Sequence, residues 1–175
     1  YLIGAILWRE YLERGRVHLG RFYVRRFRRL APAWTVMALS VFVVGWFILL
    51  PHDFRELGKS LIASTLFVAN IHFWRGSGYF DSVAEEKPLL HMWSLSLEEQ
   101  FYVVLPLLLL LCARRPRLAL WLLAGAALVS LALALGYTRQ NQTAAFFLFP
   151  FRAWELLAGV LLAILAARRP GPKQG

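Results

Sequence analysis

Cysteine is nearly absent from this sequence, which has Cys112 as its single thiol. One cysteine cannot form a disulfide within the chain, and no Cys/His spacing matches a zinc site. A disulfide scaffold is therefore excluded, and we expect no bound metal. Cys112 is typical of a small apolar residue at the end of a hydrophobic run.

Charged residues are also scarce, and acidic ones most of all. Only 17% of the residues are charged, and 10 Asp and Glu stand against 20 Lys and Arg. Soluble domains have about 25% charged residues and about 45–50% apolar ones, whereas 59% of this chain is hydrophobic. The basic residues form short clusters between apolar runs, as in the cytoplasmic loops of membrane proteins. This pattern excludes an ordinary soluble domain and argues against nucleic acid as a partner.

The apolar runs predict an all-α fold, a polytopic bundle of transmembrane helices. Membrane segments are expected at residues 31–50, 97–112, 119–137 and 148–167, with a shorter one at 60–74 and the end of a truncated helix at 1–8. Pro32 suits the first turn of the segment 31–50. Residues 9–29 are strongly basic and are expected to form a cytoplasmic loop. Because the first run is too short to span, we expect the chain to be a fragment of a larger bundle.

The basic clusters also indicate an orientation. Residues 9–29, 114–117 and 168–173 should all face the cytoplasm. If 60–74 and 97–112 both crossed the membrane, residues 114–117 would lie outside. We therefore expect residues 60–74 to be re-entrant or buried within the bundle, which is possible where protein or water covers the backbone.

The densest polar cluster precedes the apolar run 97–112. Ser96 and Glu99 have the spacing of a capping box, which would give Glu99 a structural role at a helix start. Glu98 would then occupy the second helical position, where the helix dipole favours a carboxylate. A helix over 97–112 is about 24 Å long, shorter than the hydrocarbon core of about 30 Å. Glu98 is thus expected below the membrane surface, where ionisable groups are usually functional.

His91 lies seven residues before Glu98. If the helix extends back, positions 91, 94, 98 and 102 share one face. A neutral imidazole near a carboxylate could deprotonate a hydroxyl group. The alternative is a histidine that hydrogen-bonds the backbone at the helix entry, and the residues leave both interpretations open. Ser94 and Ser96 lack the Gly-x-Ser-x-Gly elbow of a serine nucleophile.

Two further clusters place charges at helical spacing. Arg26 and Arg29 could clamp phosphates, a task that suits the planar guanidinium, or could simply anchor the chain at the cytoplasmic surface. Arg152 and Glu155 could pair with each other, which lowers the cost of having both at membrane depth. Structural pairing is the leading interpretation of that second cluster.

Together these motifs resemble the acyltransferase 3 family, the membrane O-acetylases that modify lipopolysaccharide, peptidoglycan, exopolysaccharides and some small glycosides. The matching residues are Arg26-x-x-Arg29 with Pro32, Tyr79-Phe80, the run from Leu89 to Tyr102 with Pro106, and the run from Arg152 to Gly159. The order and spacing of these motifs cover nearly the whole chain.

The resemblance implies a multi-pass protein of the bacterial cytoplasmic membrane with about ten spanning helices, of which this chain would hold the N-terminal half without the first helix. It also implies a reaction: transfer of an acyl group, acetyl by expectation, from acyl-CoA to a hydroxyl of a cell-surface or exported carbohydrate. Acyl-CoA would be a co-substrate, with no permanently bound cofactor. The lipid bilayer is the remaining partner.

By the same resemblance, His91 and Glu98 would be catalytic, and Arg26 and Arg29 would bind the donor. Trp93, Ser94, Tyr102, Arg152 and Glu155 would line the substrate site. The family also carries a histidine on its first helix, commonly assigned as the base, so either that residue or His91 would remove the proton.

A transporter or flippase of a glycan or lipid-linked substrate is the alternative function. Short apolar segments and intramembrane ionisable groups occur in such proteins too, often with inverted repeats. No internal repeat is evident here.

Overall fold

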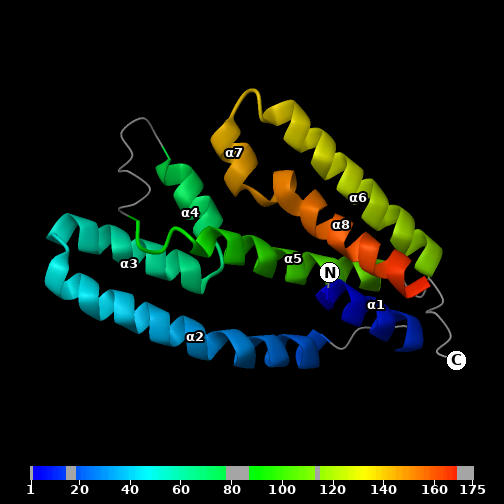
Figure 1. Ribbon diagram of the computed structural model, residues 1–175, viewed down its shortest axis with the longest axis horizontal. Coiled ribbons are helices and arrows are strands. Elements are labelled where there is room, and N and C mark those ends of the chain that lie inside the picture. The colour runs from blue at the N-terminus through cyan, green and yellow to red at the C-terminus, as the bar shows by residue number, and fades with distance from the viewer. Residues whose placement is uncertain (1, 15–18, 78–86, 113–114, 169–175) are drawn as a thin grey trace, which may run out of the picture. The chain divides into compact units, whose positions relative to one another are not determined.

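The computed structural model describes residues 2–14, 19–77, 87–112 and 115–168, which form α-helices and connecting turns with no β-strand (Figure 1). The helices are α1 (Leu2–Arg14), α2 (Leu19–Ile48), α3 (Pro51–Thr65), α4 (Ala69–Gly76), α5 (Met92–Leu111), α6 (Pro116–Tyr137), α7 (Gln142–Phe147) and α8 (Phe149–Arg168). The predicted all-α class is confirmed. Tyr79-Phe80 and most of the predicted basic tail lie outside the described residues.

The chain divides into two compact units. One consists of residues 18–99, and the other of residues 1–17 together with residues 100–175. The boundary falls inside α5, so its first two turns belong with α2, α3 and α4, and the remainder belongs with α1, α6, α7 and α8.

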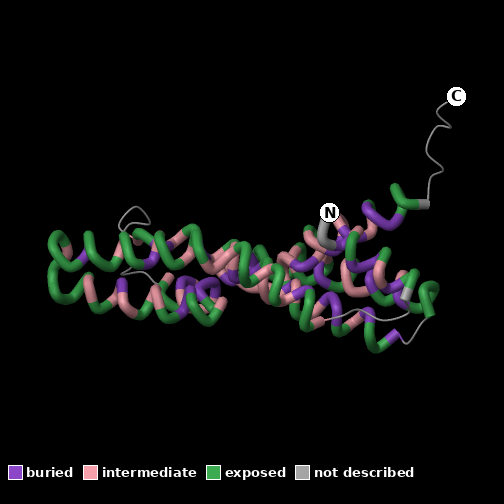
Figure 2. The backbone as a smooth tube through the Cα atoms, turned by 90° about the horizontal axis from the view of Figure 1, so that it is seen from below, coloured by how far each residue is buried: buried purple, intermediate pink, exposed green. Residues whose placement is uncertain are grey.

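Four stretches of helix are long and apolar enough to cross a membrane. They are α2, α5, α6 and the stretch Gln142–Ala167, which runs from α7 into α8. Few of their residues are buried by other parts of the chain, least of all in α2, where the share is 6% of the apolar window (Figure 2). Helices that expose large apolar side chains along their length require lipid or further protein around them. The length and composition of these helices make the chain a multi-pass membrane protein.

Helices α3 and α4 are not among these candidate spans. That residues 60–74 are re-entrant or buried within the bundle stays a prediction.

The start of α2 differs from the prediction. Residues 9–29 were expected to form a loop and Pro32 a first helical turn, but α1 continues to Arg14 and α2 begins at Leu19. Arginine and leucine are good helix formers, so the basic stretch prolongs the apolar helix backwards. Pro32 lies inside α2 as a result.

The predicted short segment 60–74 is a broken helix. Backbone bonds from Val68 N to Ala63 O (2.8 Å) and from Phe67 N to Ser64 O (3.2 Å) end α3 in a Schellman motif. Phe67 has a φ of 53°, in the left-handed region that this motif normally fills with glycine. The chain turns at this point and continues into α4.

Gly45 lets α3 pack closely against α2. A Cβ atom at Gly45 would lie 2.7 Å from Leu57 Cδ2 and 3.2 Å from Leu49 Cδ1. Next to this contact the rings of Phe42 and Phe54 lie 5.2 Å apart. Gly45 therefore lies where the side chains of α3 pack directly against the backbone of α2.

In the other unit, a single hydroxyl joins α6 to the start of α8. Ser130 Oγ donates to Pro150 O at 2.6 Å and accepts from Trp154 N at 3.0 Å. Gly4 brings α1 equally close to α8, since a Cβ there would lie 2.7 Å from Val160 Cγ2. These contacts hold the segment that contains the Arg152 motif.

We predict that Gly45→Val separates α2 from α3 and destabilises the protein by about 1–3 kcal/mol, the usual cost of overpacking. The melting temperature of the detergent-solubilised full-length protein measures this. Gly58→Val is the matched control, because a Cβ at Gly58 meets nothing within 4 Å. Equal melting temperatures for the two variants would contradict the proposed contact.

Candidate functional site

A cavity of about 410 Å³ lies within the unit formed by residues 18–99. Its walls come from the first half of α2, from the α3–α4 junction and from the first turns of α5. The lining residues are Tyr23, Arg26, Phe27, Leu30, Ala31, Trp34, Thr35, Thr65, Phe67, Leu95 and Glu99. Aromatic and aliphatic side chains make up most of this wall, as is usual for small-molecule sites.

An ion pair between α2 and α5 forms the charged part of the wall. Arg26 Nε donates to Glu99 Oε1 at 2.6 Å, and Arg26 Nη2 lies 2.5 Å from the same oxygen. The two side chains are only 15% and 11% exposed. Hydrogen bonds between charged groups are stronger than those between neutral groups, and their strength increases where little water is present. Two residues 73 positions apart in the sequence are thereby fixed together.

The predicted capping box is wrong. α5 begins at Met92, so Ser96 lies in its second turn and cannot cap it. Ser96 Oγ instead donates to Met92 O at 3.0 Å and accepts from Ala69 N at 3.2 Å. This buried hydroxyl therefore caps the first turn of α4 from a neighbouring helix. Glu99 does not take part in a helix cap and instead pairs with Arg26.

The expectation that the helix carrying Glu98 is too short to cross the membrane is also wrong. α5 has 20 residues and is about 30 Å long, enough to cross a bilayer. The carboxylate of Glu98 is exposed, whereas its neighbour Glu99 lines the cavity. A shift of one residue turns a side chain by about 100° around a helix, which explains why adjacent glutamates have such different surroundings.

The start of α5 presents two faces. Leu95 and Glu99, four residues apart, line the cavity. His91, Ser94 and Glu98 are exposed, and the Ser94 hydroxyl donates to the His91 backbone carbonyl at 3.1 Å. Among the described residues, the His91 ring and the Glu98 carboxylate make no hydrogen bond or ion pair. Both groups are therefore accessible to a substrate.

The other predicted site residues are more covered. Trp93 and Tyr102 are both half-buried, and the Tyr102 ring lies 5.9 Å from that of Phe101. Arg29, one helical turn beyond Arg26, is exposed. Of the two predicted donor-binding arginines, only Arg26 lines the cavity.

Arg152 and Glu155 belong to the other unit and pair with each other. Arg152 Nη2 donates to Glu155 Oε2 at 2.8 Å, and the side chains are 28% and 41% exposed. Arg152 Cζ also lies 5.5 Å from the centroid of the Phe146 ring, a cation–π contact. The pairing expected from the i, i+3 spacing is present.

Several cavity residues were not predicted from the sequence. The spacing of Leu95 and Glu99 on one helical face was the available signal for Glu99. Nothing in the sequence indicated Phe67, because the left-handed position it occupies favours glycine. Trp34 has a further property: its Nε1 is buried without a hydrogen-bond partner among the described residues.

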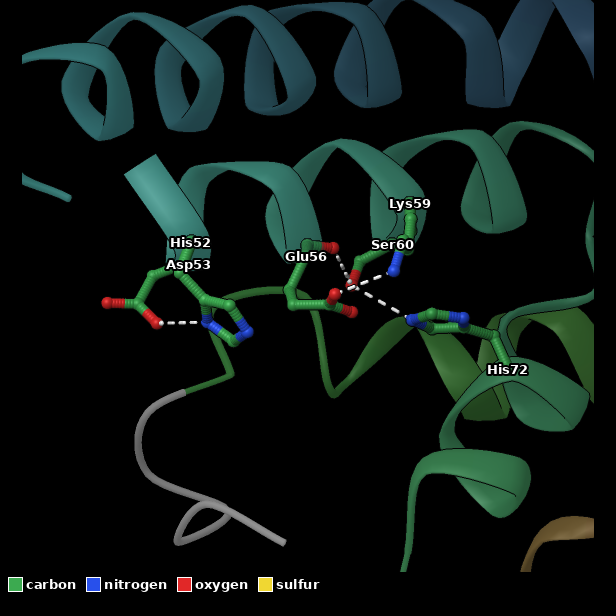
Figure 3. A network of polar contacts seen from close by, with 6 residues as sticks. All are labelled: His52, Asp53, Glu56, Lys59, Ser60 and His72. Atoms are coloured by element: carbon green, nitrogen blue, oxygen red, sulfur yellow. Dashed lines mark hydrogen bonds and ion pairs between the residues drawn. The ribbon is translucent and has the colours of Figure 1, made fainter. Parts of the chain in front are cut away.

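A polar network connects α3 to α4 (Figure 3). His72 Nε2 lies 3.3 Å from Ser60 Oγ, and Ser60 Oγ donates to Glu56 O at 3.0 Å. Lys59 Nζ donates to Glu56 Oε1 at 2.7 Å. The hydrogen bond from Lys59 lowers the pKa of Glu56. The network orients the two helices whose junction carries Phe67.

Burial lowers the pKa of His72 from its ordinary value of 6.5. The nearby Glu56 carboxylate acts in the opposite direction, and Lys59 and Lys87 add to the lowering. His72 is therefore neutral near pH 7, and its uncharged ring hydrogen-bonds Ser60.

Comparison with known sequences identifies the class. Residues 1–172 match the family described as "Acyltransferase domain", the acyltransferase 3 family. The chain belongs to this family. A protein from Haemophilus influenzae is 35% identical over 173 residues, which are 94% of this chain and 70% of that relative. The peptidoglycan O-acetyltransferase OatA of Listeria monocytogenes is 34% identical over 171 residues, again 94% of this chain but only 27% of that relative. No solved structure matches.

We predict that Arg26→Gln and Glu99→Gln each destabilise the protein by about 1–3 kcal/mol, because each leaves a poorly solvated charge without its partner. The double variant should lose less than the sum of the two, since both charges are then gone. Thermal or denaturant unfolding of all four proteins gives the coupling. The exposed pair Lys59–Glu56 is the control, with an expected coupling of about 0.5 kcal/mol. Additive losses at Arg26 and Glu99 would show that the pair is not formed.

We also predict acid sensitivity at the α3–α4 contact. Between the lowered pKa of folded His72 and its ordinary value, the unfolded chain binds a proton that the folded chain does not. Stability from this residue is therefore lost as the pH falls below the ordinary pKa of 6.5 toward the lowered pKa of folded His72. The melting temperature of His72→Gln should fall less over this range than that of the wild type. His52→Gln, at an exposed position on α3, should keep the wild-type slope, and an unaltered slope in His72→Gln would refute the assignment.

Proposed function

We propose that this chain is part of an integral-membrane O-acyltransferase that moves an acyl group, acetyl by preference, from acyl-CoA to a hydroxyl of a cell-surface or exported carbohydrate. The observation that carries the proposal is the cavity with Arg26 and Glu99 in its wall. Its volume falls in the range of small-molecule sites, about 300–1,000 Å³. Membership of the acyltransferase 3 family and the named activity of the Listeria relative support the same reaction.

The acyl-CoA donor would bind to arginine side chains of α2. Arg29 is exposed one turn from Arg26, so its guanidinium can meet the phosphates of coenzyme A in the two-pronged geometry that arginine offers. Arg26, already paired with Glu99, would keep the cavity wall in place beneath the donor. The basic clusters around α2 and after α5 suit the cytoplasmic face of a bacterial inner membrane, the side on which acyl-CoA is made.

The acceptor would meet the exposed face at the start of α5. His91 would take the proton of the sugar hydroxyl, and Glu98, on the same exposed face, would stabilise the imidazolium. The hydroxyl oxygen would attack the thioester carbonyl carbon, a new C–O bond would form and the C–S bond would break. The thiolate would leave as coenzyme A and take up a proton, and the products would be an O-acylated sugar and the free thiol. Trp93 and Ser94, on the first turn of α5, would border this site.

We predict that the full-length protein in proteoliposomes releases coenzyme A thiol from acetyl-CoA only when a glycan acceptor is present. Glu98→Gln should lower this rate about 10²-fold without lowering the melting temperature, because a positioned acid–base pair contributes about 10²–10⁴-fold. Glu56→Gln, an exposed carboxylate of α3, is the matched control and should keep the wild-type rate.

Two results would contradict the proposal. Passage of the glycan across the membrane without any thiol release would establish a transporter or flippase. Wild-type rates in Glu98→Gln would remove that residue from the mechanism, and wild-type rates in His91→Gln as well would leave this chain without a base.

A further inference from the structure

The cavity wall combines apolar surface with one donor that lacks an acceptor. Phe27, Leu30 and Leu95 provide aliphatic and aromatic surface, and the charges of Arg26 and Glu99 are satisfied by each other. The indole N–H of Trp34 is different, because it is buried and has no hydrogen-bond partner within the described chain. A ligand that matches this wall has an apolar body and a single acceptor oxygen, the features of an acyl chain with its carbonyl group.

Phe67 is held in an unfavourable backbone conformation at the edge of the same cavity. Its φ of 53° is one that glycine adopts at no cost and a phenylalanine adopts rarely. The Schellman motif that ends α3 would form equally well, and with less strain, around a glycine. Strain of this kind persists where the surrounding structure requires it, and it gathers at ligand-binding sites. What phenylalanine adds over glycine here is a ring in the cavity wall.

The volume of the cavity is larger than the smallest acyl group needs. About 410 Å³ is a space for a drug-sized ligand, whereas an acetyl group has three heavy atoms. The apolar walls can therefore accept further methylene groups, and each methylene buried in such a pocket changes discrimination by about 10–200-fold.

We propose that this cavity is the acyl-chain pocket of the transferase, that the Trp34 N–H donates to the acyl carbonyl oxygen, and that the Phe67 ring limits the length of the chain. This inference rests on the proposed acyl transfer, and it adds which lengths of acyl chain the enzyme accepts. The pocket accepts acyl groups longer than acetyl up to the point where the chain meets Phe67.

The test uses the full-length protein with a series of acyl-CoA donors from acetyl to octanoyl. Phe67→Ala should raise the ratio of kcat/KM for hexanoyl-CoA over acetyl-CoA at least about tenfold. Phe67→Gly should give the same change while keeping or raising the melting temperature, because it also removes the strain. Leu66→Ala is the matched control, since Leu66 is 65% exposed and does not line the cavity. Its chain-length profile should equal that of the wild type.

Trp34→Phe separates the carbonyl contact from the chain pocket. It keeps an aromatic wall and removes the N–H, so it should raise KM for all donors about tenfold and leave the chain-length ratio unchanged. A ratio that shifts in Trp34→Phe, or that stays constant in both Phe67 variants while transfer proceeds, would overturn the inference.

The outcome also distinguishes this inference from the proposed reaction. If no donor yields thiol but hexanoyl-CoA still binds more tightly to Phe67→Gly than to wild type in equilibrium titration, the acyl pocket stands and acyl transfer fails. If thiol is released and the Phe67 variants have the same acyl-chain-length profile as the wild type, acyl transfer stands and the pocket assignment fails. If no donor yields thiol and hexanoyl-CoA binds no more tightly to Phe67→Gly than to the wild type, both fail.

Discussion

The ion pair between Arg26 and Glu99 is the contact on which the arrangement of residues 18–99 depends. It connects the basic first half of α2 to the polar start of α5, two segments that lie far apart in the sequence. Few of the α2 residues are buried by the rest of the chain, so apolar packing alone does little to hold this helix. A short, shielded charge pair is directional, and it fixes which face of each helix meets the other. The cavity lies between the first half of α2, the α3–α4 junction and the first turns of α5, next to this ion pair.

Adjacent residues at the start of α5 have separate tasks for the same reason. Once Glu99 is turned toward Arg26, helical geometry directs Glu98 and Ser94 to the exposed side. The proposed donor pocket and the proposed acceptor face thus lie on adjacent faces of one helix, about 100° apart around its axis. A rigid helix is a suitable support for such a site, because its side chains keep their relative positions without loops.

Much of the fold could be predicted from the sequence, and less of the site. The lengths of the apolar runs predicted the approximate positions of α2, α5, α6 and α8, because a helix must be long and apolar to cross the lipid. Helix starts were placed too late at Pro32 and at Ser96, since charged and polar residues with good helix propensity extend a helix beyond its apolar part. The local Ser96–Glu99 pattern suggested a cap, but both side chains bond to distant helices instead. Such tertiary contacts, like the left-handed backbone at Phe67, leave no periodic trace in a sequence.

The buried hydroxyl of Ser96 has a consequence for the persistence of α4. A helix of eight residues is marginal by itself, because its few hydrogen bonds barely offset the conformational entropy lost in forming the first turn. Its first amide, at Ala69, is held by a side chain of the much longer α5. The Ala69 amide can exchange its hydrogen with solvent only when that bond opens, so the first turn of α4 should be better protected from exchange than a free helix end. The Ser96 hydroxyl therefore stabilises the start of α4, directly after the α3–α4 junction that lines the cavity.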